Sequence, residues 1–93
     1  MSVSIRIPTI LRTYTDGANE VTVEPAEATL ASVLDALEDA APGIKARVLD
    51  ENGALRRFVN VYADDEDVRF VGGLDTPTPA GTKVSIIPAV AGG

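Results

Sequence analysis

The chain has 93 residues, of which 45% are hydrophobic and 24% charged, and it carries a formal net charge of −6. This length fits one domain, which buries roughly 60 to 65% of its unfolded surface and so can fold alone. The negative charge repels phosphates and acidic lipids. We therefore expect no nucleic acid and no membrane among the partners, and a basic protein surface as the natural complement.

Cysteine and histidine are both missing from the sequence. Their absence excludes disulfides, thiol catalysis, His-based triads and metal sites with Cys or His ligands in this chain. The N-terminus lacks the pattern of a signal peptide, and no apolar run approaches the roughly 18 residues of a membrane span. We expect a cytoplasmic protein with no bound metal or cofactor.

Two strands are predicted near the start of the chain by alternating apolar residues. Residues 3–7 place Val3, Ile5 and Ile7 on one side and end near Pro8. Residues 20–24 repeat the alternation, and an Asp-Gly turn lies between the two runs. A pair of neighbouring strands is the simplest interpretation.

One long helix is predicted after Thr29, a favoured N-cap residue. Its apolar residues follow the spacing i, i+3, i+4, i+7 and form one stripe: Leu30, Val33, Leu34 and Leu37. The pair Pro42-Gly43 ends the helix, because the residue before proline resists helical geometry and glycine tolerates the exit. About 12 residues make a marginal helix alone, so we expect it to pack on the strands.

The rest of the chain alternates short elements with turns. The sequence predicts a short helix at 44–49, a turn at 50–53, a strand at 55–63, an acidic turn at 64–67, a short strand at 68–70, a loop at 72–81 and a last strand at 83–87 that Pro88 stops. This order predicts an α+β domain of the β-grasp (ubiquitin-like) class, with one main helix packed on a mixed four- to five-stranded sheet. Residues 1–88 then form the domain, and residues 89–93 form a flexible tail.

A patch on the sheet face away from the helix is the first candidate site. The face toward the helix is expected to carry Val3, Ile5, Ile7, Val21, Val23, Val59, Val61, Val84 and Ile86. Phe58, Asn60 and Tyr62 have the outward parity on their strand. Ile87 has it on the last strand, next to Pro88. Because an exposed apolar patch on a small monomer often marks an interaction site, we predict partner docking there. Two alternatives stay open: the loop before the last strand covers the patch, or a one-residue register error reverses the parity.

The end of the chain is the second candidate site. It consists of small residues that cannot build a core: Ala89, Val90, Ala91, Gly92 and Gly93. Five extended residues reach roughly 17 Å, and glycine lacks the Cβ that would block a narrow channel. The tail follows the last strand without a linker and ends in an ionised carboxylate. A frayed terminus is the simple alternative to a functional tail.

The order of elements and three stretches of the sequence are similar to those of a known protein family. The stretches are residues 7–12, 57–70 and 81–93. Within them, Phe58-Val59-Asn60-Val61-Tyr62 and the final Ala-Val-Ala-Gly-Gly are the most distinctive. Over essentially its whole length the chain resembles the ThiS/MoaD family of ubiquitin-like sulfur carriers. The ending is most similar to the branch of that family that serves cysteine biosynthesis.

This resemblance implies that Gly93 is the covalent attachment site and that residues 89–92 are recognised as a tail. An E1-like adenylyltransferase and sulfurtransferase would use ATP to adenylate the Gly93 carboxylate and convert it into a thiocarboxylate. A PLP-dependent cysteine synthase would accept the sulfur, and a zinc metallopeptidase would release the cysteine. The chain would then be a protein co-substrate, not an enzyme, and would have no catalytic residues of its own.

Other functions remain compatible with the same tail. A MoaD-type subunit for molybdopterin synthesis, or a sulfur donor for thiamin or a thiolated secondary metabolite, would use the same chemistry. A ubiquitin-like protein modifier would instead join Gly93 to lysine side chains. A plain binding module would not use the tail at all.

Three further clusters carry weaker signals. The acidic run at 64–67 lacks the spacing of an EF-hand loop, so a solvated turn that also steers basic partners is the favoured interpretation. Gly72-Gly73 lacks the ending of a phosphate-binding loop. Arg56 and Arg57 could pair with the acidic turn or face a partner, and the sequence does not decide between these roles.

Overall fold

The structure, a computed structural model, describes residues 2–57 and 59–88, so Met1, Phe58 and residues 89–93 lie outside it. The described residues form these strands: β1 (Val3–Arg6), β2 (Glu20–Val23), β3 (Val59–Ala63), β4 (Glu66–Asp67) and β5 (Lys83–Pro88). Their helices are α1 (Leu30–Ala40) and α2 (Lys45–Val48), with 3-10 helices η1 (Thr9–Thr15), η2 (Val68–Phe70) and η3 (Gly73–Asp75).

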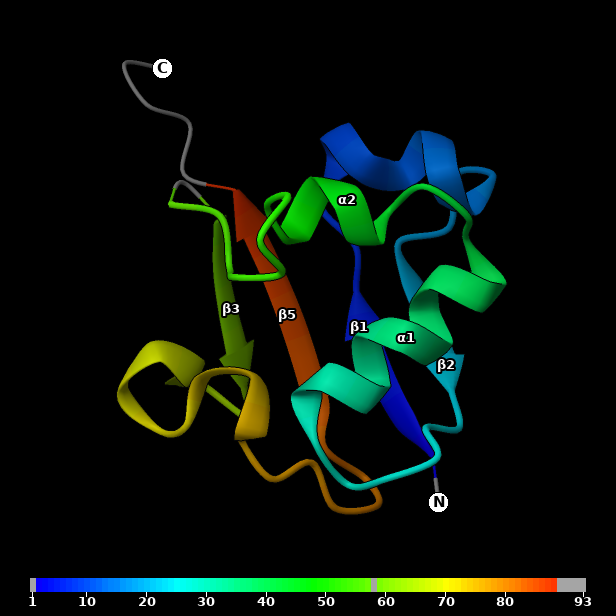
Figure 1. Ribbon diagram of the computed structural model, residues 1–93. Helices are drawn as coiled ribbons and strands as arrows, with labels where there is room; N and C mark the ends of the chain where they lie inside the picture. The colour runs from blue at the N-terminus through cyan, green and yellow to red at the C-terminus, as the bar shows by residue number, and fades with distance from the viewer. Residues whose placement is uncertain (1, 58, 89–93) are drawn as a thin grey trace.

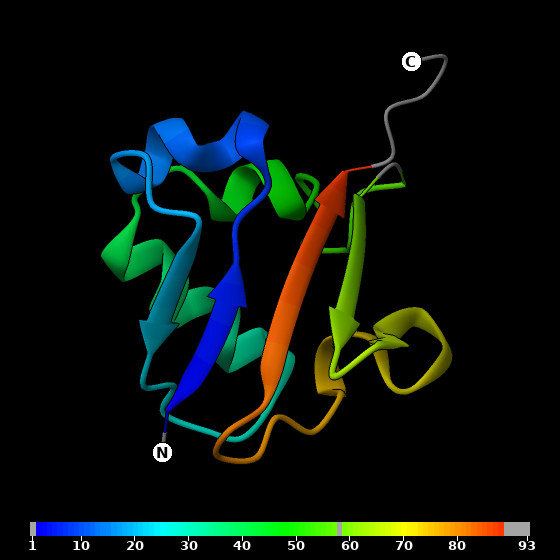
Figure 2. The same ribbon diagram turned by 180° about the vertical axis from the view of Figure 1, so that it is seen from behind.

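The strands form one mixed sheet in the order β2-β1-β5-β3-β4. β1 and β5 run parallel, and the other neighbouring pairs are antiparallel. α1 crosses one face of the sheet (Figure 1), and the view from behind shows the other face with no helix over it (Figure 2). This is the predicted β-grasp architecture of one main helix on a mixed sheet.

α1 begins and packs as its sequence predicts. The Thr29 hydroxyl accepts a hydrogen bond from the Ser32 amide at 3.3 Å, which satisfies one of the free N–H groups of the first turn. The predicted apolar stripe is completely buried, and it consists of Leu30, Val33, Leu34 and Leu37. Burying a leucine or valine side chain stabilises a fold by about 1.5 to 3 kcal/mol. The stripe therefore fixes the face that α1 turns to the sheet.

Gly43 shapes the exit from α1. Its φ of +98° lies in the left-handed region, which a residue with a side chain adopts at a cost. A Cβ built there would lie 3.0 Å from the Cε1 atom of Tyr14, so the ring also leaves no room for one. This close approach joins the end of α1 to η1, and the chain then turns into α2, the predicted short helix.

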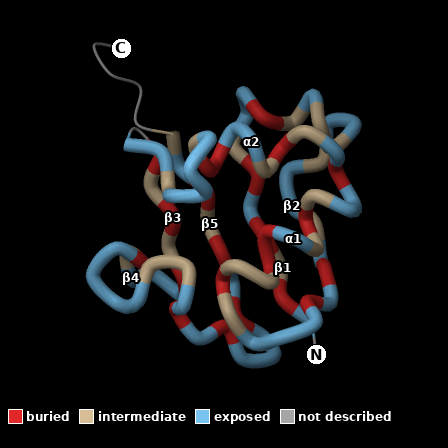
Figure 3. Tube along the Cα trace, viewed as in Figure 1, coloured by how far each residue is buried: buried red, intermediate tan, exposed pale blue. Residues whose placement is uncertain are grey.

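The core lies between α1 and the sheet and contains the predicted inward face. Its buried members are Val3, Ile5, Ile7, Val23, Val59, Val61, Val84 and Ile86. Val21 is half-buried, because β2 is an edge strand. Figure 3 shows buried residues recurring along the neighbouring strands β1 and β5.

The stretch from residue 55 to residue 70 differs from the prediction. β3 begins at Val59, because Leu55 instead forms a local bridge with Leu49. The acidic turn is shorter than expected: only Asp64 and Asp65 take positive φ, and residues 66–67 pair with β3 as β4. Residues 68–70 form the 3-10 helix η2 and not a strand, since the Asp67 carboxylate caps them by accepting from the Arg69 amide.

Candidate functional site

The tail is attached to a strand in the interior of the sheet. β5 lies between β1 and β3, and its last residue, Pro88, pairs with Val59 at the start of β3. Proline suits the end of a strand, because it has no N–H to continue the ladder. The predicted attachment site Gly93 and the recognition residues 89–92 lie outside the described residues. The structure therefore places the point where residues 89–93 begin: the end of β5, where Ile86, Ile87 and Pro88 pair with β3.

The predicted docking patch lies on the open sheet face. Asn60 pairs with Ile87, and Tyr62 pairs with Ser85, so these four side chains share the face opposite α1. Ile87 is 46% exposed, while Asn60, Tyr62 and Pro88 are half-buried. Phe58 lies outside the described residues. The predicted outward parity is therefore confirmed for Asn60, Tyr62 and Ile87, whereas Pro88 pairs with Val59 and has the parity of the inward set.

The loop before β5 does not run over this face. The Thr76 carbonyl accepts a hydrogen bond from the Leu30 amide at 3.0 Å, and the Thr78 amide donates to the Ala28 carbonyl at 2.9 Å. Pro77 forms a bridge with Thr29, the N-cap of α1. These contacts hold the loop at the beginning of α1, on the helix side of the sheet, which leaves Ile87 accessible.

Arg69 links η2 to the start of β3, and sequence analysis did not identify it. Its Nη1 atom donates to the Asn60 side-chain oxygen at 2.8 Å. Its Nη2 atom donates to the Arg56 carbonyl at 2.6 Å and to the Val59 carbonyl at 2.7 Å. Asp67, two residues earlier, is the one local signal, because an Asx turn fixes the backbone at that position. The acceptors themselves are 9 to 13 residues away in the sequence, so no local pattern points to them.

Several charged residues whose roles the sequence does not decide have contacts in the structure. Arg56 donates from Nε to the Ala46 carbonyl at 3.0 Å, which ties the segment before β3 to α2. The Asp64 carboxylate accepts from the Lys83 amide at 2.9 Å. Asp67 caps η2. No group of three acidic side chains within residues 2–57 and 59–88 is arranged to hold a metal ion.

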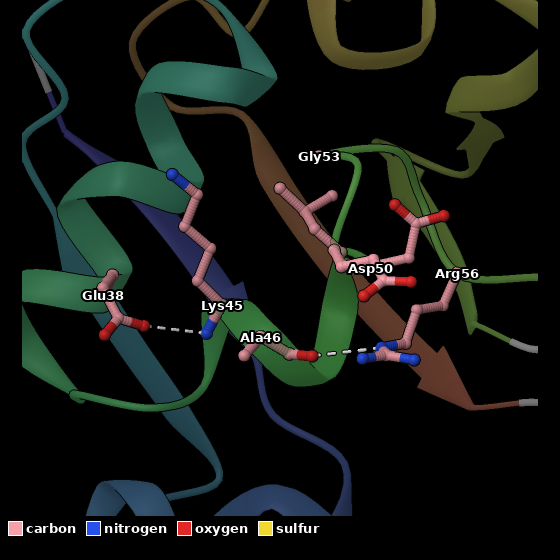
Figure 4. A pocket seen from close by; sticks show the side chains of 8 residues that line it. Glu38, Lys45, Ala46, Asp50, Gly53 and Arg56 are labelled. Carbon is pink, nitrogen blue, oxygen red and sulfur yellow. Dashed lines mark hydrogen bonds between the residues drawn. The ribbon is translucent and has the colours of Figure 1, made fainter.

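A groove of about 560 Å³ lies between the end of α1, α2 and the loop after α2 (Figure 4). The Glu38 carboxylate accepts from the Gly43 and Lys45 amides, each at 2.9 Å. These hydrogen bonds, from Gly43 first and then from Lys45, hold the pKa of Glu38 below its ordinary value of 4.5. On the other side, Asp50 accepts from the Asn52 and Ala54 amides. Both carboxylates accept hydrogen bonds from backbone amides and so hold the turns that border the groove.

Comparison with known proteins adds to this geometry. Residues 5–93 match the ThiS family. The sulfur carrier protein CysO of Mycobacterium tuberculosis is 48% identical over 95 residues, which cover 100% of both chains. A chain of the Amycolatopsis orientalis BexX/CysO complex superposes with a TM-score of 0.88 and 49% identity, covering 98% of this chain and 99% of that one. Small archaeal modifier protein 1 of Haloferax volcanii is 34% identical over 67 residues, or 72% of each chain.

The fold and the end of β5 define a small protein of the ubiquitin-like β-grasp class. The family match and the full-length similarity to CysO go further: the chain belongs to the ThiS family. Its homologues at this level of identity are sulfur carrier proteins. Among the described residues, no helix has the length and apolar composition needed to cross a membrane.

Proposed function

We propose that this protein carries sulfur as a thiocarboxylate on Gly93 and donates it in cysteine biosynthesis. The observation that carries the proposal is the ending: β5 closes at Pro88, and the five remaining residues of this ThiS family member finish in Gly92-Gly93. The name of the sulfur carrier protein CysO, 48% identical over its full length, supports the pathway. We place the protein in the cytoplasm, as a co-substrate and not an enzyme.

The chemistry assigns the reactive steps to partners. A carboxylate is a poor acyl electrophile, so an E1-like enzyme first joins the Gly93 carboxylate to the α-phosphate of ATP and releases pyrophosphate. A sulfide equivalent then attacks the acyl carbon, and AMP leaves. The carrier contributes the tail, whose glycines allow a narrow channel to close around the backbone. The partner supplies the positioning that makes the step fast.

The thiocarboxylate is consumed in the next step. A PLP-dependent cysteine synthase takes it as the sulfur source, and the cysteine formed stays attached to Gly93 until a zinc metallopeptidase cleaves it. The carrier returns with a free carboxylate and acts again. The assembly of a similar carrier with BexX in the Amycolatopsis orientalis complex supports docking of such carriers on protein partners.

Ile87 and the open sheet face form the docking patch in this proposal, together with Phe58, Asn60, Tyr62 and Pro88. Ile87 is the exposed apolar side chain of the patch that the structure describes, and it lies next to the residue where the tail begins. Ile87→Ser should raise the KM of the activating enzyme for the carrier. The matched control is Ile10→Ser, since Ile10 is 65% exposed on η1. Equal KM values for the two variants would contradict docking at Ile87.

The proposal is tested by reconstitution. The untagged carrier is incubated with the activating enzyme, ATP and sulfide, and its intact mass is measured. We expect the mass increase of one oxygen-to-sulfur exchange, localised to Gly93 by fragmentation. Deletion of Gly93 should abolish the exchange and should also abolish cysteine formation by the synthase. The proposal would be refuted if the carrier never gained this mass and if deletion of Gly93 had no effect in cells.

A second function is favoured by one observation, the 34% identity to small archaeal modifier protein 1. A modifier would form an isopeptide bond between Gly93 and a lysine of another protein. Higher-mass conjugates that resist both thiols and denaturants, and that disappear when Gly93 is deleted, would support this alternative.

The receiving pathway can be tested separately. If the carrier forms a thiocarboxylate but no cysteine synthase accepts its sulfur, the reconstitution is repeated with a molybdopterin, thiamin or secondary-metabolite acceptor, and the acceptor that takes the sulfur identifies the pathway.

A further inference from the structure

Phe70 and Val71 form an apolar pair at the edge of the sheet that the fold leaves uncovered. Phe70 is 88% exposed and Val71 is 46% exposed. We infer that this pair, the η2 epitope, is a second docking surface for the enzyme that activates Gly93. The surface that would fit it on the enzyme is an apolar pocket rimmed by lysine or arginine. The inference rests on the proposed function and adds a contact surface for the same partner outside the tail.

The η2 epitope has a firm support. Val68, at the start of η2, is completely buried. The Val68 carbonyl accepts from both the Val71 and Gly72 amides, each at 3.1 Å. The Asp67 cap and the three hydrogen bonds of Arg69 fix the same turn. Because the backbone of this turn is already fixed, ordering it costs little entropy on binding, and aromatic anchors are common at the centre of binding hot spots.

A hollow of about 240 Å³ lies beside Val71. Its lining includes the apolar residues Ala63 and Pro77 and the acidic residues Asp64 and Glu66. An apolar wall next to acidic groups suits the side chain of lysine or arginine, whose aliphatic stem packs while its charge meets the carboxylates. The epitope therefore presents an aromatic knob and, next to it, a hole for a basic side chain.

The charge of this segment also indicates a basic partner. Residues 64–75 contain five carboxylates and one arginine, a net charge of −4 out of −6 for the chain. The arginine is Arg69, whose guanidinium is bonded to β3 and its preceding loop. Complementary potentials speed encounter and select among partners. The same charge disfavours nucleic acids and acidic membranes, so a protein is the fitting occupant.

The η2 epitope and the tail lie within reach of one partner. Arg69 bonds the Val59 carbonyl, and Val59 pairs with Pro88, the residue before the tail. Figures 1 and 2 both show η2 projecting from the β3 edge of the sheet, on the opposite side of the molecule from η1. The tail offers only small side chains for contact. Affinity from a surface outside the tail allows an enzyme to bind the carrier firmly and still release the tail.

The test compares steady-state thiocarboxylate formation by the activating enzyme for full-length carriers. Phe70→Ala should raise the KM for the carrier by about tenfold or more, as truncation of an aromatic hot spot does, while kcat at saturation stays unchanged. Phe70→Trp should largely retain the wild-type KM, because it keeps an aromatic ring. Ile10→Ala is the matched control, an exposed apolar residue on η1. Thermal unfolding checks that the variants fold. We expect little change in stability, because the Phe70 side chain is exposed.

Charge is tested with a matched pair of reversals. Glu66→Lys should raise the KM more than Glu51→Lys, which changes the net charge equally but lies on the loop after α2, and the difference should shrink as salt is added. Wild-type KM for Phe70→Ala, with normal thiocarboxylate formation, would overturn the η2 epitope and leave the proposed function intact. If the wild-type carrier forms no thiocarboxylate, the proposed function fails and this inference fails with it.

Discussion

The Arg69 guanidinium donates a hydrogen bond of 2.7 Å to the carbonyl oxygen of Val59, the residue that pairs with the last residue of β5. Two more hydrogen bonds, to Asn60 and to the Arg56 carbonyl, make Arg69 the link between η2 and the start of β3. The start of β3, which pairs with the end of β5, is therefore held by a side chain from η2. The sequence pattern of that segment predicts only a short strand.

Replacement of Arg69 should lower stability and loosen this region. Hydrogen bonds to a charged group contribute roughly 1.5 to 3 kcal/mol where they are shielded, and exposure reduces that, so we expect Arg69→Ala to cost about 1 to 2 kcal/mol in the free energy of unfolding. Arg69→Lys should recover only part, because the compact ammonium lacks the rigid planar fork with which the guanidinium reaches separate acceptors. Hydrogen exchange should show faster exchange at the Val59 amide and around η2. Equal stability of the alanine variant and the wild type would contradict this role.

The central elements were predictable because each has a dense local pattern. The α1 stripe, the Thr29 cap and the alternation in β1 and β5 all lie within a few residues, and all of them are confirmed. The predictions are wrong in segments whose conformation is set by contacts with residues distant in the sequence. Val68-Arg69-Phe70 alternates like a strand, yet its conformation is set by the Asp67 cap and by acceptors on β3.

Three other features show where local patterns suffice and where they do not. Residues 9–15 form η1, which the sequence does not predict, because a 3-10 helix has no periodicity that distinguishes it from a loop. The prediction of an outward patch succeeded for Asn60, Tyr62 and Ile87 because strand parity needs only one correct register. The exposed position of Phe70 could not be predicted, since composition places most phenylalanines in a core.

Gly43→Ala should destabilise the protein more than a comparable change elsewhere. The positive φ alone costs about 1 kcal/mol for a residue with a Cβ, and contact of the new Cβ with the Tyr14 ring adds to this cost. Gly53→Ala is the matched control: its φ is +80°, but a Cβ there meets nothing within 4 Å. Urea unfolding should give a larger loss for Gly43→Ala. Equal losses would show that the ring yields freely.

Thr78→Val should stabilise the fold. The Thr78 hydroxyl is buried, and within residues 2–57 and 59–88 it has no hydrogen-bond partner. Removing an unsatisfied buried hydroxyl should gain about 1 kcal/mol. Thr76→Val and Thr82→Val serve as controls, because those hydroxyls donate to the Gly73 and Pro79 carbonyls at 2.7 Å. Thermal melts should move in opposite directions for Thr78 and for the two controls, and a loss of stability for Thr78→Val would contradict the assignment.

Glu38 should make the stability depend on acidity. Its pKa is lowered in the folded state by hydrogen bonds from the Gly43 and Lys45 amides, so its contribution is complete well above the ordinary pKa of 4.5 and is lost as the pH falls through the folded pKa. Glu38→Gln should therefore be less stable than the wild type at pH 7, and the difference should shrink on acidification. Urea unfolding at a series of pH values measures it. A difference that does not change with pH would exclude this linkage.

The intact mass of the untagged protein from its own cells tests the central claim most directly. The account predicts a population heavier by one oxygen-to-sulfur exchange, with the extra mass on Gly93, which disappears when the carrier is extended beyond Gly93 by a C-terminal tag. The same tag should abolish sulfur transfer and leave the fold unchanged. A native protein found only as the free carboxylate, together with a tagged protein that retains full activity, would contradict the account.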